Sequence, residues 1–159
     1  MLAVAFLVAV LIGSPAWQAP DFSGAWSFDA QKTMTPDEKG RVVLAAMLGQ
    51  EFTAIQDASS LTLRILNNGQ LLVAVYDLTG RPVENVSPGD IVVTSRAKWD
   101  RDRLVITSSS TSDEQGKPVK VETTRVLWID KAGDLIIERS GTPESLVTAS
   151  RSVYRRLRK

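Results

Sequence analysis

Hydrophobic and polar residues alternate with a period of two along most of the chain, from Phe52 to Tyr154. A clear example is the run in which Leu61, Leu63 and Ile65 alternate with a threonine and an arginine. Successive side chains of a β-strand point to opposite faces, so this period is typical of strands with one buried face. The pattern therefore predicts an all-β domain.

Short turn sequences divide this region into hairpins. They occur at Asn67–Gly69, Asp100–Asp102 and Lys131–Gly133, and a longer loop rich in glycine and proline covers Thr79–Asp90. The segments between them predict about eight or nine antiparallel strands in an up-and-down order. Such a meander leaves two free edges unless it closes on itself, so we expect a single antiparallel β-barrel.

One helix is expected before the hairpins. Thr35 is suited to the N-cap, Pro36 to the first helical position, and Glu38 to a capping box. A short apolar stripe follows, and Gly49 is a natural stop. These features predict one short helix over residues 36–48.

The chain begins with an apolar run, Met1–Ile12, followed by Gly13-Ser14-Pro15-Ala16. This pattern is typical of a secretory signal peptide at residues 1–16, with cleavage possible as late as residue 19. The run is shorter than the ~20 residues of a membrane span, although a retained anchor is the alternative. We expect a secreted or periplasmic protein, with a barrel domain at residues 21–155 and a basic tail at 156–159.

The composition limits the chemistry of the protein. The chain has no cysteine and no histidine, which excludes disulfides, histidine metal sites and Ser-His or Cys-His nucleophile pairs. The net charge of +1 provides no global field for nucleic acid or a membrane surface. No acidic run has metal-loop spacing and no glycine-rich loop precedes a helix, so neither a metal nor another cofactor is expected.

Two apparent catalytic motifs have simpler explanations. Ser95 and Lys98 match the S-x-x-K of serine acyl-enzymes, but that motif requires a helix and these residues lie on a predicted strand. Asp100 and Asp102 resemble paired carboxylates, but they alternate with arginines at a predicted hairpin tip. We therefore expect no catalytic residues; a carboxylate-based hydrolase is the least favoured hypothesis.

Gly24-Ala25-Trp26 forms a G-x-W in the first predicted strand. In a closed barrel the first strand must pair with the last, and a tryptophan at that place can fill one end. Gly24 lets another backbone approach closely, because it has no Cβ.

Several segments together resemble a known group of proteins. They are Phe22–Trp26, Ala97–Asp100, Leu104–Thr107 and Val153–Arg156. With the leader, they resemble the small secreted lipocalin-like proteins of bacteria over nearly the whole mature chain. The G-x-W also resembles the first motif of the lipocalins, which hold small hydrophobic molecules inside an eight-stranded barrel. The resemblance implies a lipocalin-like barrel that binds a ligand.

The lipocalin resemblance also implies a basic residue near the chain end that packs over Trp26. Arg151 is the best-placed candidate, because it shares a predicted inward face of the last strand with Val147 and Val153. Arg139 is the second choice.

Arg125 is the most informative polar residue of the predicted lumen. It shares a face with Val121, Thr123, Leu127 and Ile129, and we expect this face to point inward. A buried guanidinium needs a partner, which is either the carboxylate of a ligand or an internal glutamate or backbone carbonyl.

Other side chains are expected beside Arg125. Ser108 and Ser110 are candidates to share the lumen, and Trp99 lies on the same predicted face as Val93 and Ala97. The tryptophans Trp26, Trp99 and Trp128 either line a pocket or fill the ends of the barrel. We expect Arg125, Thr123, Ser108, Ser110 and Trp99 to bind the ligand.

Two functional hypotheses follow. The leading one is a non-enzymatic binding protein that holds a small, largely apolar or amphipathic molecule in the barrel. The alternative is an envelope or secreted interaction module whose barrel is filled with side chains. The two differ in the lumen: large inward residues throughout favour the second, whereas small residues beneath a wet arginine favour the first.

Overall fold

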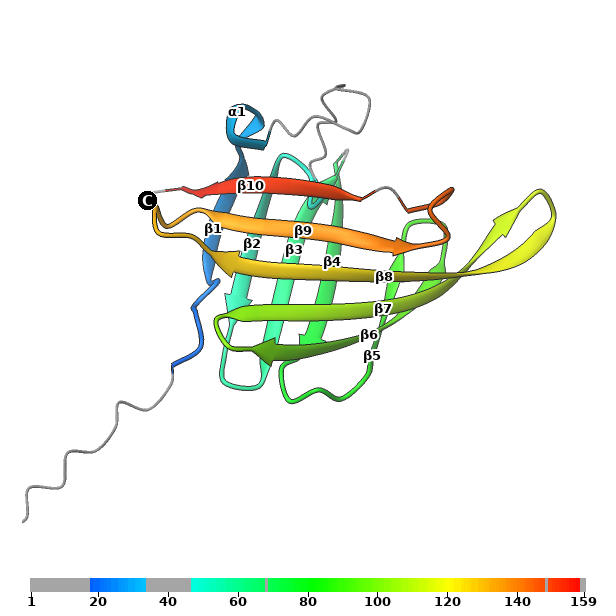
Figure 1. Ribbon diagram of the computed structural model, residues 1–159, viewed down its shortest axis with the longest axis horizontal. Coiled ribbons are helices and arrows are strands. Elements are labelled where there is room, and N and C mark those ends of the chain that lie inside the picture. Colours follow the sequence, from blue (N-terminus) through cyan, green and yellow to red (C-terminus); the bar gives the residue numbers. More distant parts are fainter. Residues whose placement is uncertain (1–17, 34–46, 68, 148, 158–159) are drawn as a thin grey trace, which may run out of the picture.

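The computed structural model of the chain describes residues 18–33, 47–67, 69–147 and 149–157. Within these ranges it consists of one ten-stranded antiparallel sheet and one short helix (Figure 1). The elements are β1 (Gly24–Phe28), α1 (Ala30–Thr33), β2 (Glu51–Gln56), β3 (Ser60–Asn67), β4 (Gln70–Asp77), β5 (Val83–Ser87), β6 (Ile91–Asp100), β7 (Arg103–Glu114), β8 (Lys117–Ile129), β9 (Leu135–Thr142) and β10 (Ser150–Arg156).

The sheet curls into a nearly closed barrel. Its strand order is β4-β3-β2-β1-β10-β9-β8-β7-β6-β5. The first strand therefore pairs with the last, as predicted, and β1 lies in the middle of the sheet between β2 and β10. In Figure 1, β2–β4 form one layer and β7–β10 cross it as a second layer. The two free edges, β4 and β5, come together on the far side of the barrel from β1.

The predicted fold class is confirmed, with one additional strand. Strand β5 (Val83–Ser87) lies inside the segment that the sequence analysis assigned to a loop. Its residues do alternate between less and more exposed positions, but the strand is only five residues long. Prolines and glycines lie at both ends of the strand, and they favour a loop over so short an alternating pattern.

The predicted helix at 36–48 lies largely outside the described residues. Of its last two positions, Met47 forms an isolated bridge with Gly49 and Leu48 lies in a turn. The helix that the structure describes is α1, which follows β1 directly. In the described part of the chain, no helix combines the length and the apolarity that a membrane crossing requires. The leader at 1–16 also lies outside the described residues.

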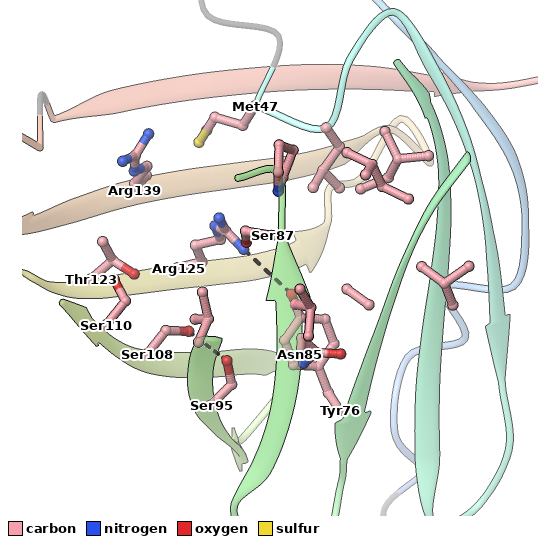
Figure 2. A pocket seen from close by; sticks show the side chains of 18 of the residues that line it. Met47, Tyr76, Asn85, Ser87, Ser95, Ser108, Ser110, Thr123, Arg125 and Arg139 are labelled. Carbon is pink, nitrogen blue, oxygen red and sulfur yellow. Dashed lines mark hydrogen bonds between the residues drawn. The ribbon is translucent and has the colours of Figure 1, made fainter. Parts of the chain in front are cut away.

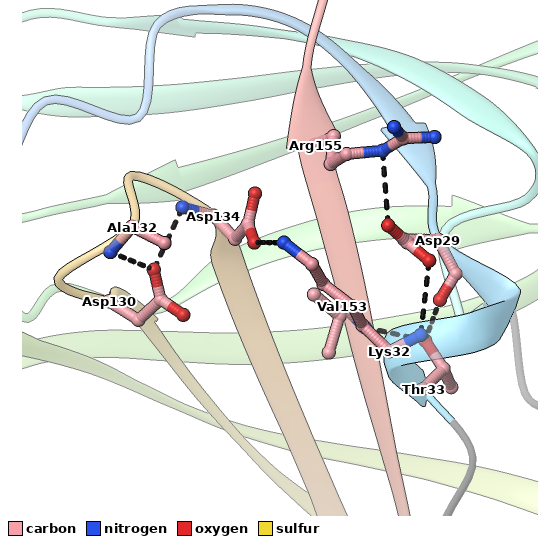
Figure 3. A network of polar contacts seen from close by, with 8 residues as sticks. All are labelled: Asp29, Lys32, Thr33, Asp130, Ala132, Asp134, Val153 and Arg155. Atoms are coloured by element: carbon pink, nitrogen blue, oxygen red, sulfur yellow. Dashed lines mark hydrogen bonds and ion pairs between the residues drawn. The ribbon is translucent and has the colours of Figure 1, made fainter.

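Helix α1 is fixed to the barrel by a network of polar contacts (Figure 3). The Asp29 carboxylate accepts a hydrogen bond from the Lys32 amide at 3.0 Å and pairs with Arg155 of β10 at 3.1 Å. The buried Thr33 hydroxyl donates to the Asp29 carbonyl at 2.7 Å and accepts from the Val153 amide at 2.9 Å. The Lys32 ammonium contacts a carboxylate oxygen of Asp134 at the start of β9. Each of these charged and polar groups has its partner within the fold, so we assign the network a structural role.

Large apolar side chains fill the part of the barrel around Trp26, which is fully buried. Its indole N–H donates to the Phe22 carbonyl at 2.9 Å, and Phe22 in turn stacks on Trp99 with ring centroids 5.6 Å apart. Other fully buried members of this core are Leu61, Leu104, Ile106, Leu127, Leu135, Ile137 and Tyr154. The tryptophan of the G-x-W therefore fills one part of the lumen, as expected.

A cation does lie over Trp26, but it is not Arg151. The Arg156 guanidinium carbon is 4.5 Å from the centre of the indole ring, because the register places Trp26 directly opposite Arg156. The prediction of Arg151 is wrong: that side chain is exposed and lies 4.0 Å from Glu138. The predicted inward face of the last strand was offset, since Ser152 and Tyr154 are buried as well as Val153.

Gly24 has the role of permitting a close approach, although to a side chain and not to a backbone. A Cβ added at Gly24 would lie 3.3 Å from a guanidinium nitrogen of Arg156, and its φ of +131° favours glycine. Arg156 also donates to the carbonyls of Ser23 and Asp21, at 2.5 and 3.0 Å. One arginine thus joins the end of β10 to the start of β1.

Replacing Trp26 by alanine should lower the free energy of unfolding by ~3–5 kcal/mol, as other large-to-small changes in cores do. Chemical denaturation measures this loss. Arg156→Met should cost less, because the methionine retains much of the packing over the ring and loses the charge and its hydrogen bonds.

Trp128→Ala is the matched control for this experiment. Trp128 also lies under a guanidinium, that of Arg103 at 4.4 Å, but it is not part of the buried core. Trp128→Ala should therefore lower the free energy of unfolding clearly less than Trp26→Ala does. Equal losses for the two tryptophans would contradict the structural role of the G-x-W.

The buried Tyr154 should make the fold sensitive to alkaline pH. Burial raises the pKa of Tyr154 to about 12, while its hydroxyl accepts from the Leu48 amide at 2.9 Å. An unfolded tyrosine ionises near pH 10, so between pH 10 and about 12 the unfolded chain binds fewer protons than the folded one. Stability should therefore fall across this window as the pH rises.

Denaturation midpoints measured from pH 9 to 12 test this dependence. Tyr154→Phe keeps the ring but cannot ionise, so its midpoint should fall less steeply than that of the wild type. Parallel curves for the two proteins would contradict the assignment.

Candidate functional site

The barrel is filled on one side and hollow on the other. A cavity of about 390 Å³ extends between the sheet layers on the side away from Trp26, and Figure 2 shows its walls. It is lined by Met47, Leu48, Ile65, Leu72, Val73, Ala74, Tyr76, Asn85, Val86, Ser87, Pro88, Val93, Ser95, Ser108, Ser110, Val121, Thr123, Arg125 and Arg139. Its volume falls in the range of small-molecule pockets, which is roughly 300–1,000 Å³.

Most of the polar residues predicted for the lumen do meet here. Arg125 and Thr123 on β8 and Ser108 and Ser110 on β7 all line the cavity. They come together because β7 and β8 pair with Ser108 opposite Thr123 and Ser110 opposite Val121, which places these side chains on one face. The expectation that Arg125 points inward is thus met by the geometry.

Trp99 lies elsewhere. Its ring stacks on Phe22 in the filled part of the barrel, and it does not line the cavity. The alternation along β6 correctly placed Trp99 toward the interior, but sequence alone did not reveal that the interior is divided into a filled and a hollow part. The assignment of Trp99 to ligand binding is therefore not supported by its position.

A second arginine, Arg139 on β9, faces Arg125 across the strand pair. The sequence analysis considered Arg139 only as a second choice for packing over Trp26. Its position could have been inferred from the period of β9, since Arg139 follows the buried Leu135 and Ile137 at intervals of two. What the sequence could not supply was the register that places it opposite Arg125.

The two guanidinium groups are poorly neutralised. An Nη of Arg125 donates to the Tyr76 hydroxyl at 3.3 Å, and the Nε atoms of both arginines are buried without a hydrogen-bond partner. Within the described residues, no carboxylate forms an ion pair with either arginine. Neither the internal glutamate nor the backbone carbonyl that was the alternative partner of Arg125 is found among the described residues.

Burial and the neighbouring charge both disfavour the charged form of Arg139. Burial lowers the pKa of Arg139, and the positive charge of Arg125 lowers it further. Two like charges on directly opposed residues repel each other, and partial desolvation strengthens the repulsion. An anion between the two guanidinium groups would reduce this repulsion.

The wall opposite Met47 is made of small hydroxyl side chains. The Ser95 and Ser108 hydroxyls form a hydrogen bond of 2.8 Å, and Ser95 is almost fully buried. Figure 2 shows these serines on one side of the arginines and Met47 on the other. Small polar residues beside an arginine were the pattern expected for a ligand cavity rather than a filled barrel.

The apparent catalytic motifs do not assemble into a site. Ser95 faces the cavity while Lys98, on the same strand, is exposed. Asp100 and Asp102 lie at the β6–β7 hairpin tip, where both are exposed. Among the residues that the structure describes, no group of three or more histidine, cysteine, aspartate or glutamate side chains could hold a metal ion.

Comparison with known proteins identifies the fold alone. No protein-family model matches the chain, and no curated protein sequence matches it. Among the solved structures, 90 chains match. One of them is apo lipid binding protein 8 of Caenorhabditis elegans, with a TM-score of 0.56 and 10% sequence identity, covering 86% of this chain and 95% of that one. The chain therefore shares the antiparallel barrel fold of that structure.

Proposed function

We propose that this protein is a non-enzymatic carrier of a small amphipathic molecule, which it holds in the cavity between the two layers of the barrel. The ligand has an apolar tail and an anionic head such as a carboxylate. The observation that carries the proposal is the pair Arg125 and Arg139, which point into the cavity without a neutralising carboxylate among the described residues.

The energetics of the arginines favour an anionic ligand. Burying charge without a partner is costly, and an anion placed between two guanidinium groups would relieve both the desolvation and their mutual repulsion. Arginine suits this task because its planar fork can bind a carboxylate through two parallel hydrogen bonds. The Tyr76 hydroxyl, already 3.3 Å from Arg125, provides a further donor.

The rest of the cavity suits an apolar tail. Ile65, Leu72, Val93 and Val121 line its walls. A volume of about 390 Å³ accommodates one small molecule and leaves no room for a protein segment with a core of its own. The hollow half favours this function over the alternative of an interaction module with a filled barrel. The likeness in fold to a lipid binding protein supports the same choice.

The proposal includes an exported location, secreted or periplasmic. It rests on the apolar leader at residues 1–16. The likeness to small lipocalin-like bacterial proteins suggests the same compartment.

Binding of two matched fluorescent probes tests the proposed function. 1-Anilinonaphthalene-8-sulfonate and N-phenyl-1-naphthylamine share an aromatic body, but only the first carries an anionic group. Losing a charge-assisted hydrogen bond weakens binding about ten- to hundredfold, so Arg125→Met and Arg139→Met should each weaken binding of the sulfonate by that factor. Binding of the neutral probe should change much less.

Stability of the ligand-free variants is the control. Arg139→Met keeps an unbranched chain in place of the aliphatic part of the arginine and removes one of two repelling charges, so the free energy of unfolding should stay unchanged or rise by up to ~1 kcal/mol. A wild-type protein that binds neither probe would contradict the proposal. So would variants that lose affinity for both probes equally, because that result would indicate damage to the cavity and not loss of a charge partner.

A further inference from the structure

The two edges of the sheet are joined by one side chain. We use "the seam" for the gap between β4 (Gln70–Asp77) and β5 (Val83–Ser87), across which the described residues form no backbone ladder. Across the seam, the Asn85 amide oxygen accepts from the Val75 N–H at 2.8 Å, and the amide nitrogen donates to the Val75 carbonyl at 2.9 Å. These are the two bonds that a residue of a neighbouring strand would make. The Asn85 side chain thus replaces a missing ladder.

The seam is also an opening of the cavity. Val73 on β4 and Val86 on β5 line the cavity, yet they are 46% and 62% exposed. Side chains that contact both the cavity and the solvent mark the place where the cavity reaches the surface. Further exposed aliphatic residues flank the same place, namely Leu71 and Val75 on β4 and Val92 on β6. An apolar tail can cross these edges without losing contact with apolar surface.

The seam is the weakest junction of the barrel. Each of the other strand pairs shares at least three residue pairs, whereas among the described residues the hydrogen bonds between β4 and β5 are the two of Asn85. Both bonds are exposed, so water can replace them, and their net contribution is small. Strand β5 has only five residues and a ladder on one side, to β6, so it is the element with the lowest cost of local opening.

We propose that Asn85 is a latch that controls ligand exchange through the seam. This inference rests on the proposed function, since it concerns how the ligand reaches the same cavity. When the latch opens, β5 separates from β4 and a ligand passes between Val73 and Val86. When it closes, the ligand is held against Arg125 and Arg139.

A latch has a kinetic signature that a binding residue lacks. If the ligand enters and leaves only through the open state, a larger open population raises the association and dissociation rates by the same factor. The equilibrium affinity, which is their ratio, then stays the same. Loss of a direct contact with the ligand would instead raise mainly the dissociation rate.

Stopped-flow fluorescence with 1-anilinonaphthalene-8-sulfonate measures both rates. Asn85→Ala removes both bonds across the seam, and Asn85→Leu keeps the approximate size of the side chain without adding a charge but can neither accept from the Val75 N–H nor donate to the Val75 carbonyl. Each should raise both rates by about tenfold, equivalent to about 1.4 kcal/mol, with the dissociation constant unchanged within about twofold. Glu84→Ala is the control, because Glu84 is exposed on the same strand. It should leave both rates at wild-type values.

A second measurement does not depend on ligand binding. The chain has no cysteine, so Ser95→Cys introduces a single thiol on the cavity wall, at a position that is only 3% exposed. Its rate of alkylation by iodoacetamide, followed by mass spectrometry, reports how often the cavity opens. In the Ser95→Cys background, Asn85→Ala should raise this rate by the same factor of about ten, and Glu84→Ala should not.

The two measurements separate the possible failures. If 1-anilinonaphthalene-8-sulfonate does not bind but alkylation is faster in the Asn85 variants, the proposed function fails and the latch stands. If alkylation and both exchange rates are the same in Asn85→Ala and wild type, the latch is overturned. If Asn85→Ala does not fold, Asn85→Leu serves for both measurements.

Discussion

The pairing of β1 with β10 is the constraint on which the rest of the barrel depends. It places the first strand in the middle of the sheet, with Trp26 opposite both Phe52 and Arg156. The indole is fully buried in the lumen, and the Arg156 guanidinium lies over its ring. With this side fixed, the two free edges of the meander meet on the other side of the barrel.

The uneven filling of the barrel follows from this arrangement. Aromatic and large aliphatic side chains gather around Trp26 and Tyr154, whereas β6, β7 and β8 present serine, threonine and arginine to the other half. A core that only had to be stable would not place Arg125 opposite Arg139 without a carboxylate, because desolvation and repulsion both oppose it. The unpaired arginines lower the free energy of unfolding, and such destabilising groups are expected where a protein binds a ligand.

Much of this could be predicted from the sequence. Period two, the hairpin turns and the G-x-W were sufficient for an antiparallel barrel with its first and last strands paired. The same period placed Arg125 and Thr123 on an inward face, because side-chain direction along one strand is a local property. Ser108 and Ser110 were expected beside them and do line the same cavity.

The remainder depends on register, which is not local. A slip of one residue moves every side chain of a strand to the other face, so the last strand could not be read reliably and Arg151 was chosen in place of Arg156. The period of β9 is enough to place Arg139 on an inward face, but only the register shows that it lies opposite Arg125. Strand β5 was taken for a loop because proline and glycine surround its five residues, and with it the role of Asn85 was hidden.

We propose that the hollow half of the barrel holds a small anionic amphiphile. Native mass spectrometry tests this directly when the protein as purified is compared with the same protein after bound ligand has been removed. We expect a second species in the untreated protein, heavier by the mass of one small molecule. This species should disappear on denaturation, release an anionic amphiphile into the organic extract, and be depleted in a variant carrying both Arg125→Met and Arg139→Met. A single species at the mass of the polypeptide, which also takes up no added fatty acid, would contradict the account.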